Sequence, residues 1–430
     1  MMPVMTITLI SAAVVMFVAG VPIAAALGLA SALVLFVFQP IPNFMMITQL
    51  FSEACASFVL LAVPLFILVG ALMERGTMGR QLIDFSMALV GWVKGGLGAV
   101  NIVGSFLFGG ISGSSVADAA TFSTMLVPRM KKEGYPGDYS AAVTVTSSTL
   151  STVRPPSIQI VLAAAATNQS IGKALAGGLL PSVVILFLLL VPNYLISKKR
   201  GYGTDHPFSL SNLWRECKRC WTALLAPVII MGVILSGLVT PTEAAGIAVL
   251  YIIIVDGVFY RQLGVRDIWE SLKKTAGITS SILLIASASA LMNFIIAFEN
   301  IPQMLSVALT SVPGGKFGFI VVFLIMVLII GCVLDATPAT LIFCPLFLPA
   351  AVMLGIDPIH FILLWVLGVA LGMTTPGYGV CVFCVATITR VPIGAMIREA
   401  MPFYVVTLAA MALIAVFPQI VLVIPNLLGM

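Results

Sequence analysis

The chain has 430 residues, of which 60% are hydrophobic and 9% are charged, and its mean hydropathy is +1.16. A water-soluble protein of this length carries far more charge, so the composition indicates a polytopic membrane protein. The net charge of +5 is spread over several loops, without basic stretches that alternate with aromatic residues, which argues against nucleic-acid binding.

The first half of the chain, residues 1–200, is predicted to form one structural unit. No Lys or Arg precedes Arg75, so the N-terminus lacks the basic region of a secretory signal peptide and is expected to be retained. The stretch 97–130 has a polar, glycine-broken middle and predicts a re-entrant hairpin, while 75–94 predicts an amphipathic interfacial arm. Apolar runs predict five crossings: three scaffold helices within 6–73 (6–19, 22–38 and 53–73), a broken helix at 137–166 and a helix at 172–197.

A basic segment at 201–222 connects the two halves and is expected to lie at the cytoplasmic membrane surface. The second half, 223–430, repeats the pattern of the first, with a predicted arm at 299–316 and a predicted re-entrant hairpin at 317–354. Its predicted crossings are the scaffold helices within 223–298 (223–239, 241–258 and 278–298), a broken helix at 360–386 and a helix at 402–427.

The two halves are related by a duplication, because glycines and prolines recur 221 residues apart. The pairs are Gly110 and Gly331, Pro128 and Pro349, Gly134 and Gly355, Pro155 and Pro376, and Pro181 and Pro402. Five crossings per half is an odd number, so the second copy should be inverted relative to the first. With both termini in the periplasm, nearly all Lys and Arg residues fall in cytoplasmic segments, and only Lys173 and Lys316 lie outside.

Polar residues concentrate where the hairpins turn and the helices break. The first half has a hydroxyl-rich tip at 109–118 and a break at 147–157, and the second half has 335–338 and 372–379. Hydroxyl and freed carbonyl oxygens suit a hard monovalent cation such as sodium. The N-termini of the half-helices suit an anion. We therefore expect ions and an anionic substrate to bind where these segments meet.

At these residues the chain resembles the large membrane subunit of tripartite ATP-independent periplasmic (TRAP) transporters, within the ion-transporter superfamily. The supporting motifs are Ser112-Gly113-Ser114-Ser115 with Val116-Ala117-Asp118, Pro155-Pro156-Ser157, Pro241-Thr242-Glu243-Ala244-Ala245, Gly355-Ile356-Asp357-Pro358, and Thr375-Pro376 before Gly379. The resemblance implies a sodium-driven importer of the bacterial inner membrane that works by an elevator mechanism. It also implies two partners, a small four-helix membrane subunit and a periplasmic substrate-binding protein.

The resemblance also implies site residues. The first sodium site would be formed by Ser112, Ser114, Asp118, Ser151, Thr152 and Pro155, and the second by Asp335, Thr337, Gly372, Thr375 and Pro376. The substrate, a small organic anion, would contact Ser115, Arg154, Ser157, Thr374 and Tyr378. The chain departs from the usual family pattern at Arg154, Gln159 and Gly377, all in the expected substrate region, so the substrate does not follow from the resemblance.

Several of these residues have a second interpretation. Arg154 is the only basic residue placed inside the membrane, and it could bind a carboxylate or sulfonate of the substrate. It could instead pair with Asp118 or a backbone carbonyl, or extend its side chain to water. Asp118 and Asp335 could cap the helices that begin at the hairpin tips. The hydroxyls of 146–152 could bond carbonyls of their own helix, and Glu243 is expected to stabilise a turn.

Other functional classes receive less support. No motif of a metalloprotease, hydrolase or ATPase occurs, so we expect that the protein is not an enzyme. The cysteine pairs lack the second pair or the histidines of a zinc site. We therefore expect no cofactor, with sodium as the coupling ion. An ion channel or a proton-translocating membrane enzyme subunit stays open as an alternative. Candidate substrates are C4-dicarboxylates, sialic acid and small sulfonates.

Overall fold

The computed structural model describes residues 4–38, 44–57, 60–203, 208–310, 313–375 and 379–430, and every regular element within these ranges is helical. This confirms the all-α class. The elements of the first half are α1 (Val4–Val18), α2 (Ile23–Phe38), α3 (Phe44–Cys55), α4 (Ala62–Arg75), α5 (Met78–Val90), α6 (Gly96–Ser112), α7 (Ser115–Met125), α8 (Val127–Lys132), α9 (Gly137–Ser147), α10 (Thr149–Val153), α11 (Ile158–Ala166) and α12 (Ile171–Arg200).

The second half begins with a helix that already includes part of the predicted connector. Its elements are α13 (Leu210–Leu235), α14 (Pro241–Ile252), the π-helical segment η1 (Ile253–Phe259), α15 (Val265–Phe298), α16 (Ile301–Thr310), α17 (Gly315–Val333), α18 (Ala336–Met353), α19 (Pro358–Thr374), α20 (Val380–Thr389), α21 (Ile393–Val416) and α22 (Gln419–Leu427).

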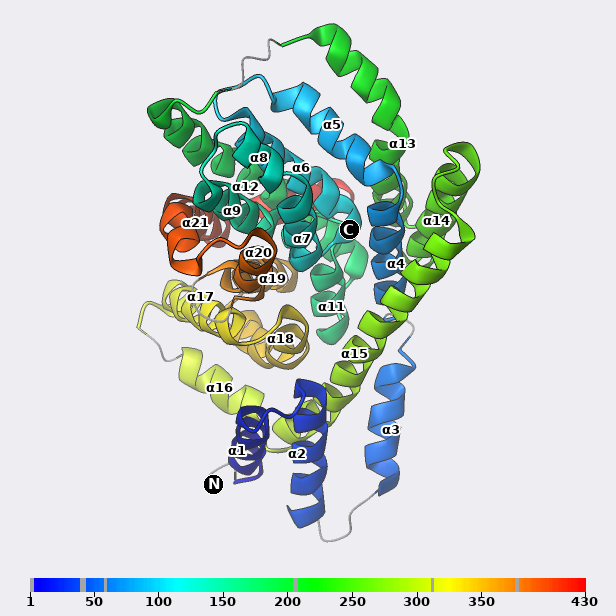
Figure 1. The fold of residues 1–430 in the computed structure, drawn as a ribbon. Coiled ribbons are helices and arrows are strands. Elements are labelled where there is room, and N and C mark those ends of the chain that lie inside the picture. The colour runs from blue at the N-terminus through cyan, green and yellow to red at the C-terminus, as the bar shows by residue number, and fades with distance from the viewer. Residues whose placement is uncertain (1–3, 39–43, 58–59, 204–207, 311–312, 376–378) are drawn as a thin grey trace.

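The helices form an outer frame and an inner group (Figure 1). In the frame, α2, α3 and α4 pack against the 34-residue helix α15, and α14 packs against α4 and α13. The inner group contains α6, α7 and α9–α12 from the first half and α17–α21 from the second. Because α15 runs along the boundary between the two groups in Figure 1, it supplies a long wall facing the hairpins.

The two halves exchange partners in a reciprocal way. The second arm of the first hairpin, α7, packs against α20, and the second arm of the second hairpin, α18, packs against α11. In the frame, α2 packs against α15 while α4 packs against α14. Reciprocal pairing of this kind is expected of a duplicated unit, and the inverted orientation of the copies in a bilayer stays a prediction.

Glycines allow each hairpin to approach its broken helix closely. A Cβ atom added to Gly109 would lie 2.5 Å from the Cα of Ser151, and one added to Gly372 would lie 2.7 Å from the Cα of Gly331. Ser151 and Gly372 occupy equivalent positions in the two repeats, 221 residues apart. The first hairpin arm therefore meets the broken helix closely in both halves, through a glycine of the arm in the first half and through glycines on both sides, Gly331 and Gly372, in the second.

The break between α10 and α11 follows from two successive prolines. Steric clash with a proline disfavours helical backbone in the residue before it, and Arg154 is extended, with ψ of 125°. The helix accordingly ends at Val153, the Pro155–Pro156 peptide bond is cis, and α11 begins after Ser157. This lies within the break that the sequence predicts at 147–157.

The observed helices differ from the predicted spans in the frame. The apolar run 53–73 is not one helix, because α3 ends at Cys55 and α4 begins at Ala62. The span predicted to begin at 278 starts already at Val265. The first turns of α15 carry several charged residues, and an apolar window misses such turns although the same helix continues through them.

The last predicted span, 402–427, also differs from the structure. Helix α21 begins nine residues earlier, at Ile393, and ends at Val416, and α22 follows as a separate short helix. Pro418 stands between them and has no backbone N–H to donate, so it interrupts the hydrogen bonds of a continuous helix. The apolar run at the C-terminus therefore contains one long helix and a shorter one.

Seven of the described helices are long and apolar enough to cross a membrane, and these are α12, α13, α14 with η1, α15, α17, α18 and α21. The other predicted crossings correspond to shorter helices or to helices in pieces, such as α9–α11 and α19–α20. A bend of 70° separates α4 from α5, and the assignment of α5 to an interfacial arm stays a prediction. Since α17 and α18 each have the length of a crossing, length alone does not identify a re-entrant hairpin.

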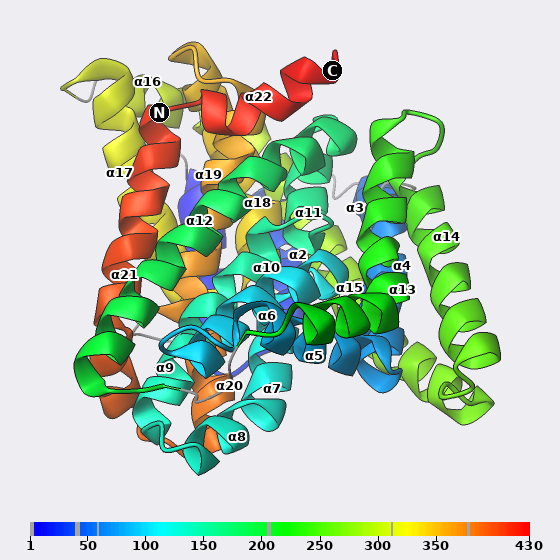
Figure 2. The same cartoon turned by 90° about the horizontal axis from the view of Figure 1, so that it is seen from above.

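Basic residues of α8 and α12 bind segments of the second half. The Nζ of Lys131 in α8 donates to the carbonyl of Thr389 (3.2 Å), and Arg200 at the end of α12 makes two bonds with Glu399 (2.7 and 3.0 Å). Figure 2 shows α8, α9 and α20 at this end and α16 and α22 at the opposite end.

Candidate functional site

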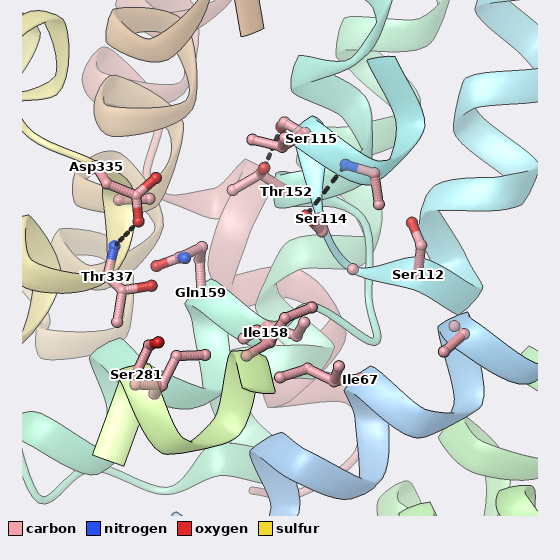
Figure 3. A pocket seen from close by; sticks show the side chains of 18 of the residues that line it. Ile67, Ser112, Ser114, Ser115, Thr152, Ile158, Gln159, Ser281, Asp335 and Thr337 are labelled. Carbon is pink, nitrogen blue, oxygen red and sulfur yellow. Dashed lines mark hydrogen bonds between the residues drawn. The ribbon is translucent and has the colours of Figure 1, made fainter. Parts of the chain in front are cut away.

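A cavity of about 390 Å³ lies between the frame and the hairpins (Figure 3). The frame contributes apolar residues from α4 and α15, including Ile67, Ile278 and Ile282, together with the polar side chains of Glu74, Lys274 and Ser281. The opposite wall consists of the two hairpin tips and the broken helices. Hydroxyl, amide and carboxylate groups lie on that wall, so polar groups face the cavity from both sides.

Three helix N-termini border the cavity. Ser114 caps α7, since its hydroxyl accepts the N–H of Ala117 (3.4 Å), and Ser157 caps α11 in the same way. Asp335 caps α18 by accepting the N–H of Thr337 (3.3 Å). The first residues of all three helices line the cavity. The positive ends of three helix dipoles therefore face the same space.

The tip of the first hairpin packs into the break between α10 and α11. A Cβ on Gly113, which has a positive φ of 59°, would lie 3.0 Å from the backbone nitrogen of Ile158. The hydroxyl of Ser115 donates to the carbonyl of Ser148 (2.7 Å) and contacts the hydroxyl of Thr152. Side-chain and backbone oxygens of the tip and the break are thus held next to one another.

The tip of the second hairpin is held against the end of α19. The thiol of Cys332 contacts the hydroxyl of Thr375 (2.9 Å), and that hydroxyl also donates to the carbonyl of Gly372 (2.8 Å). The hydroxyl of Tyr404 donates to the carbonyl of Thr374. Among the described residues, no three His, Cys, Asp or Glu side chains come together as a metal-binding group.

The structure brings some of the predicted site residues to the cavity and leaves others behind it. Those that line the cavity are Ser112, Ser114, Ser115, Thr152, Asp335 and Thr337. Those that lie in the breaks or the hairpin interior, away from the described lining, are Asp118, Ser151, Arg154, Pro155, Ser157, Gly372, Thr374 and Thr375. The predicted residues Pro376 and Tyr378 lie outside the described residues.

Arg154 binds the first hairpin and does not reach the cavity. Its Nη1 donates to the carbonyls of Phe106 (2.6 Å) and Leu107 (2.9 Å), and its guanidinium lies 4.3 Å from the centre of the Phe106 ring. No ion pair with Asp118 forms within the part of the chain that the structure describes. This geometry matches the interpretation of Arg154 as a partner of backbone carbonyls.

Gln159 is a cavity residue that the predicted site did not include. Trp365 Nε1 can only donate, and it donates to the hydroxyl of Thr340 (3.1 Å), which in turn donates to Oε1 of Gln159 (3.3 Å). The amide NH₂ of Gln159 is then left for the cavity, where Figure 3 shows its side chain between the two hairpin tips. The departure from the family pattern at this position was the sequence signal for it.

A second feature absent from the predicted site is an ion pair on the frame. Lys274 of α15 and Glu74 of α4 are 2.5 Å apart, and both line the cavity. The sequence places Lys274 in a cytoplasmic loop, because the predicted span begins only at 278. Helix α15 already includes Lys274, and only the helix bounds reveal that it faces the same cavity as Ser281.

Comparison with known proteins agrees with this architecture. Residues 10–420 match the model of the family described as "Tripartite ATP-independent periplasmic transporter, DctM component". The chain is 34% identical over 404 residues to the C4-dicarboxylate TRAP transporter large permease protein DctM of Pseudomonas aeruginosa, covering 94% of each chain. It is 33% identical over 371 residues to the sialic acid TRAP transporter large permease protein SiaM of Vibrio cholerae, covering 86% of this chain and 87% of that protein.

A solved structure supports the fold independently. The YdaH transporter of Alcanivorax borkumensis is similar with a TM-score of 0.60 over 87% of both chains, at 16% sequence identity. At this identity the likeness concerns the fold alone. The family and its named relatives are transporters and permeases, which leaves the alternatives of an ion channel or an enzyme subunit without support. The chain belongs to the DctM component family of the tripartite ATP-independent periplasmic transporters, the large permeases of these systems.

Proposed function

We propose that this permease imports a small organic anion, a carboxylate or sulfonate, together with sodium. The observation that carries the proposal is the meeting of three helix N-termini, those of α7, α11 and α18, at one cavity. Each N-terminus offers backbone N–H groups and a positive dipole end to an anion. The hydroxyls of Ser115 and Thr337 and the amide of Gln159 add polar contacts without adding negative charge.

Sodium binds, in this proposal, where each hairpin tip meets its broken helix. Ser112, Ser114, Ser115 and Thr152 supply oxygens in the first half, and Asp335, Thr337 and Thr375 supply them in the second. An ion at each position would hold the ends of two half-helices together and so preform the anion site. Binding of sodium and substrate would then be thermodynamically coupled, because each ligand orders the groups that the other needs.

The transport step is an elevator movement of the inner group along the frame. Its support is the position of the cavity between the two groups, with α4 and α15 on the frame side. The bend between α4 and α5 and the separate helix α16 give two arms beside the hairpins. Such arms allow one group to move while the other remains fixed in the bilayer.

The partners in this proposal are a small four-helix membrane subunit and a periplasmic binding protein that delivers the substrate. The family description names a tripartite, periplasmic system. Exposed apolar side chains on α1, α2 and α14, such as Val15, Phe36 and Leu250, would face lipid or the small subunit in the bacterial inner membrane. Relatives named for sialic acid and C4-dicarboxylates make these two anions the first candidates.

Uptake into proteoliposomes tests the proposal. The permease is reconstituted with its small subunit and supplied with the binding protein and either labelled succinate or labelled N-acetylneuraminate, with sodium or potassium outside. We expect uptake of an organic acid that requires both the binding protein and an inward sodium gradient. Uptake that is equally fast in potassium would refute sodium coupling, and uptake without the binding protein would refute the tripartite arrangement.

A further inference from the structure

The ion pair between Lys274 and Glu74 lies at one edge of the membrane-spanning part of the frame. Lys274 is the last charged residue of α15, and residues 275–298, which complete the helix, carry no charge. At 1.5 Å per residue this uncharged part extends over about 36 Å, enough to cross the hydrocarbon core of a bilayer, which is about 30 Å thick. Glu74 likewise follows the uncharged residues 62–73 of α4. The pair therefore marks one membrane surface, and the positive-inside rule predicts the cytoplasmic one.

The cavity connects this membrane surface with the hairpin tips. Lys274 and Glu74 line it at the edge of the membrane, and Ser281 lines it about two turns further along α15. Gln159 and Thr337 of the inner group line the same cavity, and Figure 3 draws them with Ser281 around one space. An anion held at the hairpin tips therefore has a path along α15 to Lys274.

Lys274 is the side chain in this cavity that an anion can pair with. Among the lining residues that the structure describes, the charged ones are Lys274, Glu74 and Asp335, so Lys274 is the only cation. Asp335 already serves as the cap of α18. Glu74 holds Lys274 at a distance of 2.5 Å. A carboxylate of an organic anion has the same chemistry as the side chain of Glu74, so the two compete for the same ammonium group.

The exposure of the ion pair decides whether an anion can open it. The side chains of Lys274 and Glu74 are 46% and 38% exposed, so water can solvate Glu74 after it leaves Lys274. A pair of this exposure typically contributes no more than a factor of about five to an equilibrium, whereas a buried pair is costly to separate. The frame also stays together without it, because α4 packs against α15 and Ser271 Oγ donates to the carbonyl of Ala71 (3.4 Å).

We propose that Lys274 is the residue at which the organic anion leaves the cavity toward the cytoplasm, and that the anion displaces Glu74 from Lys274 as it does so. The frame stays fixed in the elevator movement, so Lys274 meets the anion at only one end of that movement. Glu74 pairs with Lys274 again when the anion has left, which returns the cavity to its empty state. The inference rests on the proposed import of an organic anion and adds the residue of release to it.

Equilibrium binding to two variants tests the inference. The Kd values of labelled succinate and labelled N-acetylneuraminate are measured by equilibrium dialysis in sodium, with the permease purified together with its small subunit. We expect Lys274→Gln to weaken binding about tenfold and Glu74→Gln to tighten it up to about fivefold, because Glu74 no longer competes. A pair that only joins α4 to α15 is broken by either substitution and predicts equal effects. Shifts in the same direction, or an unchanged Kd in both variants, overturn the inference.

Arg75→Gln is the matched control. Arg75 and Asp267 form another ion pair between α4 and α15 (3.7 Å), and neither residue is part of the described cavity lining. We expect Arg75→Gln to bind both acids like the wild type, and a loss as large as that in Lys274→Gln overturns the inference. If Lys274→Gln does not fold, tighter binding by Glu74→Gln alone still decides. If the wild type binds an acid and the variants do not differ, the release site alone fails; if the wild type binds neither acid, the proposed function fails with it.

Discussion

The contact between Gly331 of α17 and Gly372 of α19 tests how the second hairpin is positioned. A Cβ on Gly372 would lie 2.7 Å from both the Cα and the carbonyl carbon of Gly331, and 3.0 Å from the nitrogen of Cys332. Ordinary contacts between carbon atoms are about 3.5–4.0 Å long, so Gly372→Ala must part the two helices by roughly 1 Å. All the atoms in contact belong to the backbone, so no side chain can rotate away.

We expect Gly372→Ala to lower the free energy of unfolding by about 1–3 kcal/mol, as overpacking does in other cores. For a chain of this size the melting temperature should fall by about 1–3 °C. Transport should fall further than stability, because Asp335 and Thr375 follow the two helix ends that are pushed apart. Thermal unfolding of the purified protein and uptake into proteoliposomes measure the two effects.

Gly246→Ala is the matched control. Gly246 lies within α14, and a Cβ at this position meets no atom within 4 Å. Alanine in place of a helical glycine should therefore stabilise the protein by about 0.5–1 kcal/mol. The reasoning is refuted if Gly372→Ala melts and transports like the wild type, or if Gly246→Ala is the more harmful of the two substitutions.

Three further substitutions test the cavity. Ser115→Ala removes the hydrogen bond from the Ser115 hydroxyl to the carbonyl of Ser148. The sodium concentration for half-maximal uptake should then rise about fivefold, which is the effect of one hydrogen bond. An unchanged concentration would contradict the sodium site at the hairpin tip. Glu74→Gln breaks the partly exposed ion pair with Lys274, so the free energy of unfolding should change by at most about 1 kcal/mol. The KM for the organic anion should shift. An unchanged KM would show that Lys274 does not lie on the transport path. Arg154→Leu should keep the KM of the wild type, because the guanidinium of Arg154 donates to backbone carbonyls of α6. A KM raised more than tenfold would show that Arg154 contacts the substrate.

The membrane class and the existence of broken helices follow from local properties of the sequence. Hydropathy reports whether a segment can lie in lipid, and prolines and glycines report where a helix must end or approach another backbone. Arg154 stands before two prolines, so the break at this point is evident from three adjacent residues. The hydroxyl-rich tips were found for the same reason, since Ser114 and Asp335 are typical residues for the start of a helix.

Proximity between distant segments is decided by the tertiary structure. Gln159, Lys274 and Glu74 are far apart in the sequence, and only the packing of α11, α15 and α4 brings them to one cavity. Packing likewise separates Asp118 from Ser112, which the sequence places six residues apart. The physical reason is that each helix buries one face and exposes another, and which face meets which neighbour depends on the sum of many contacts. No single motif contains that information.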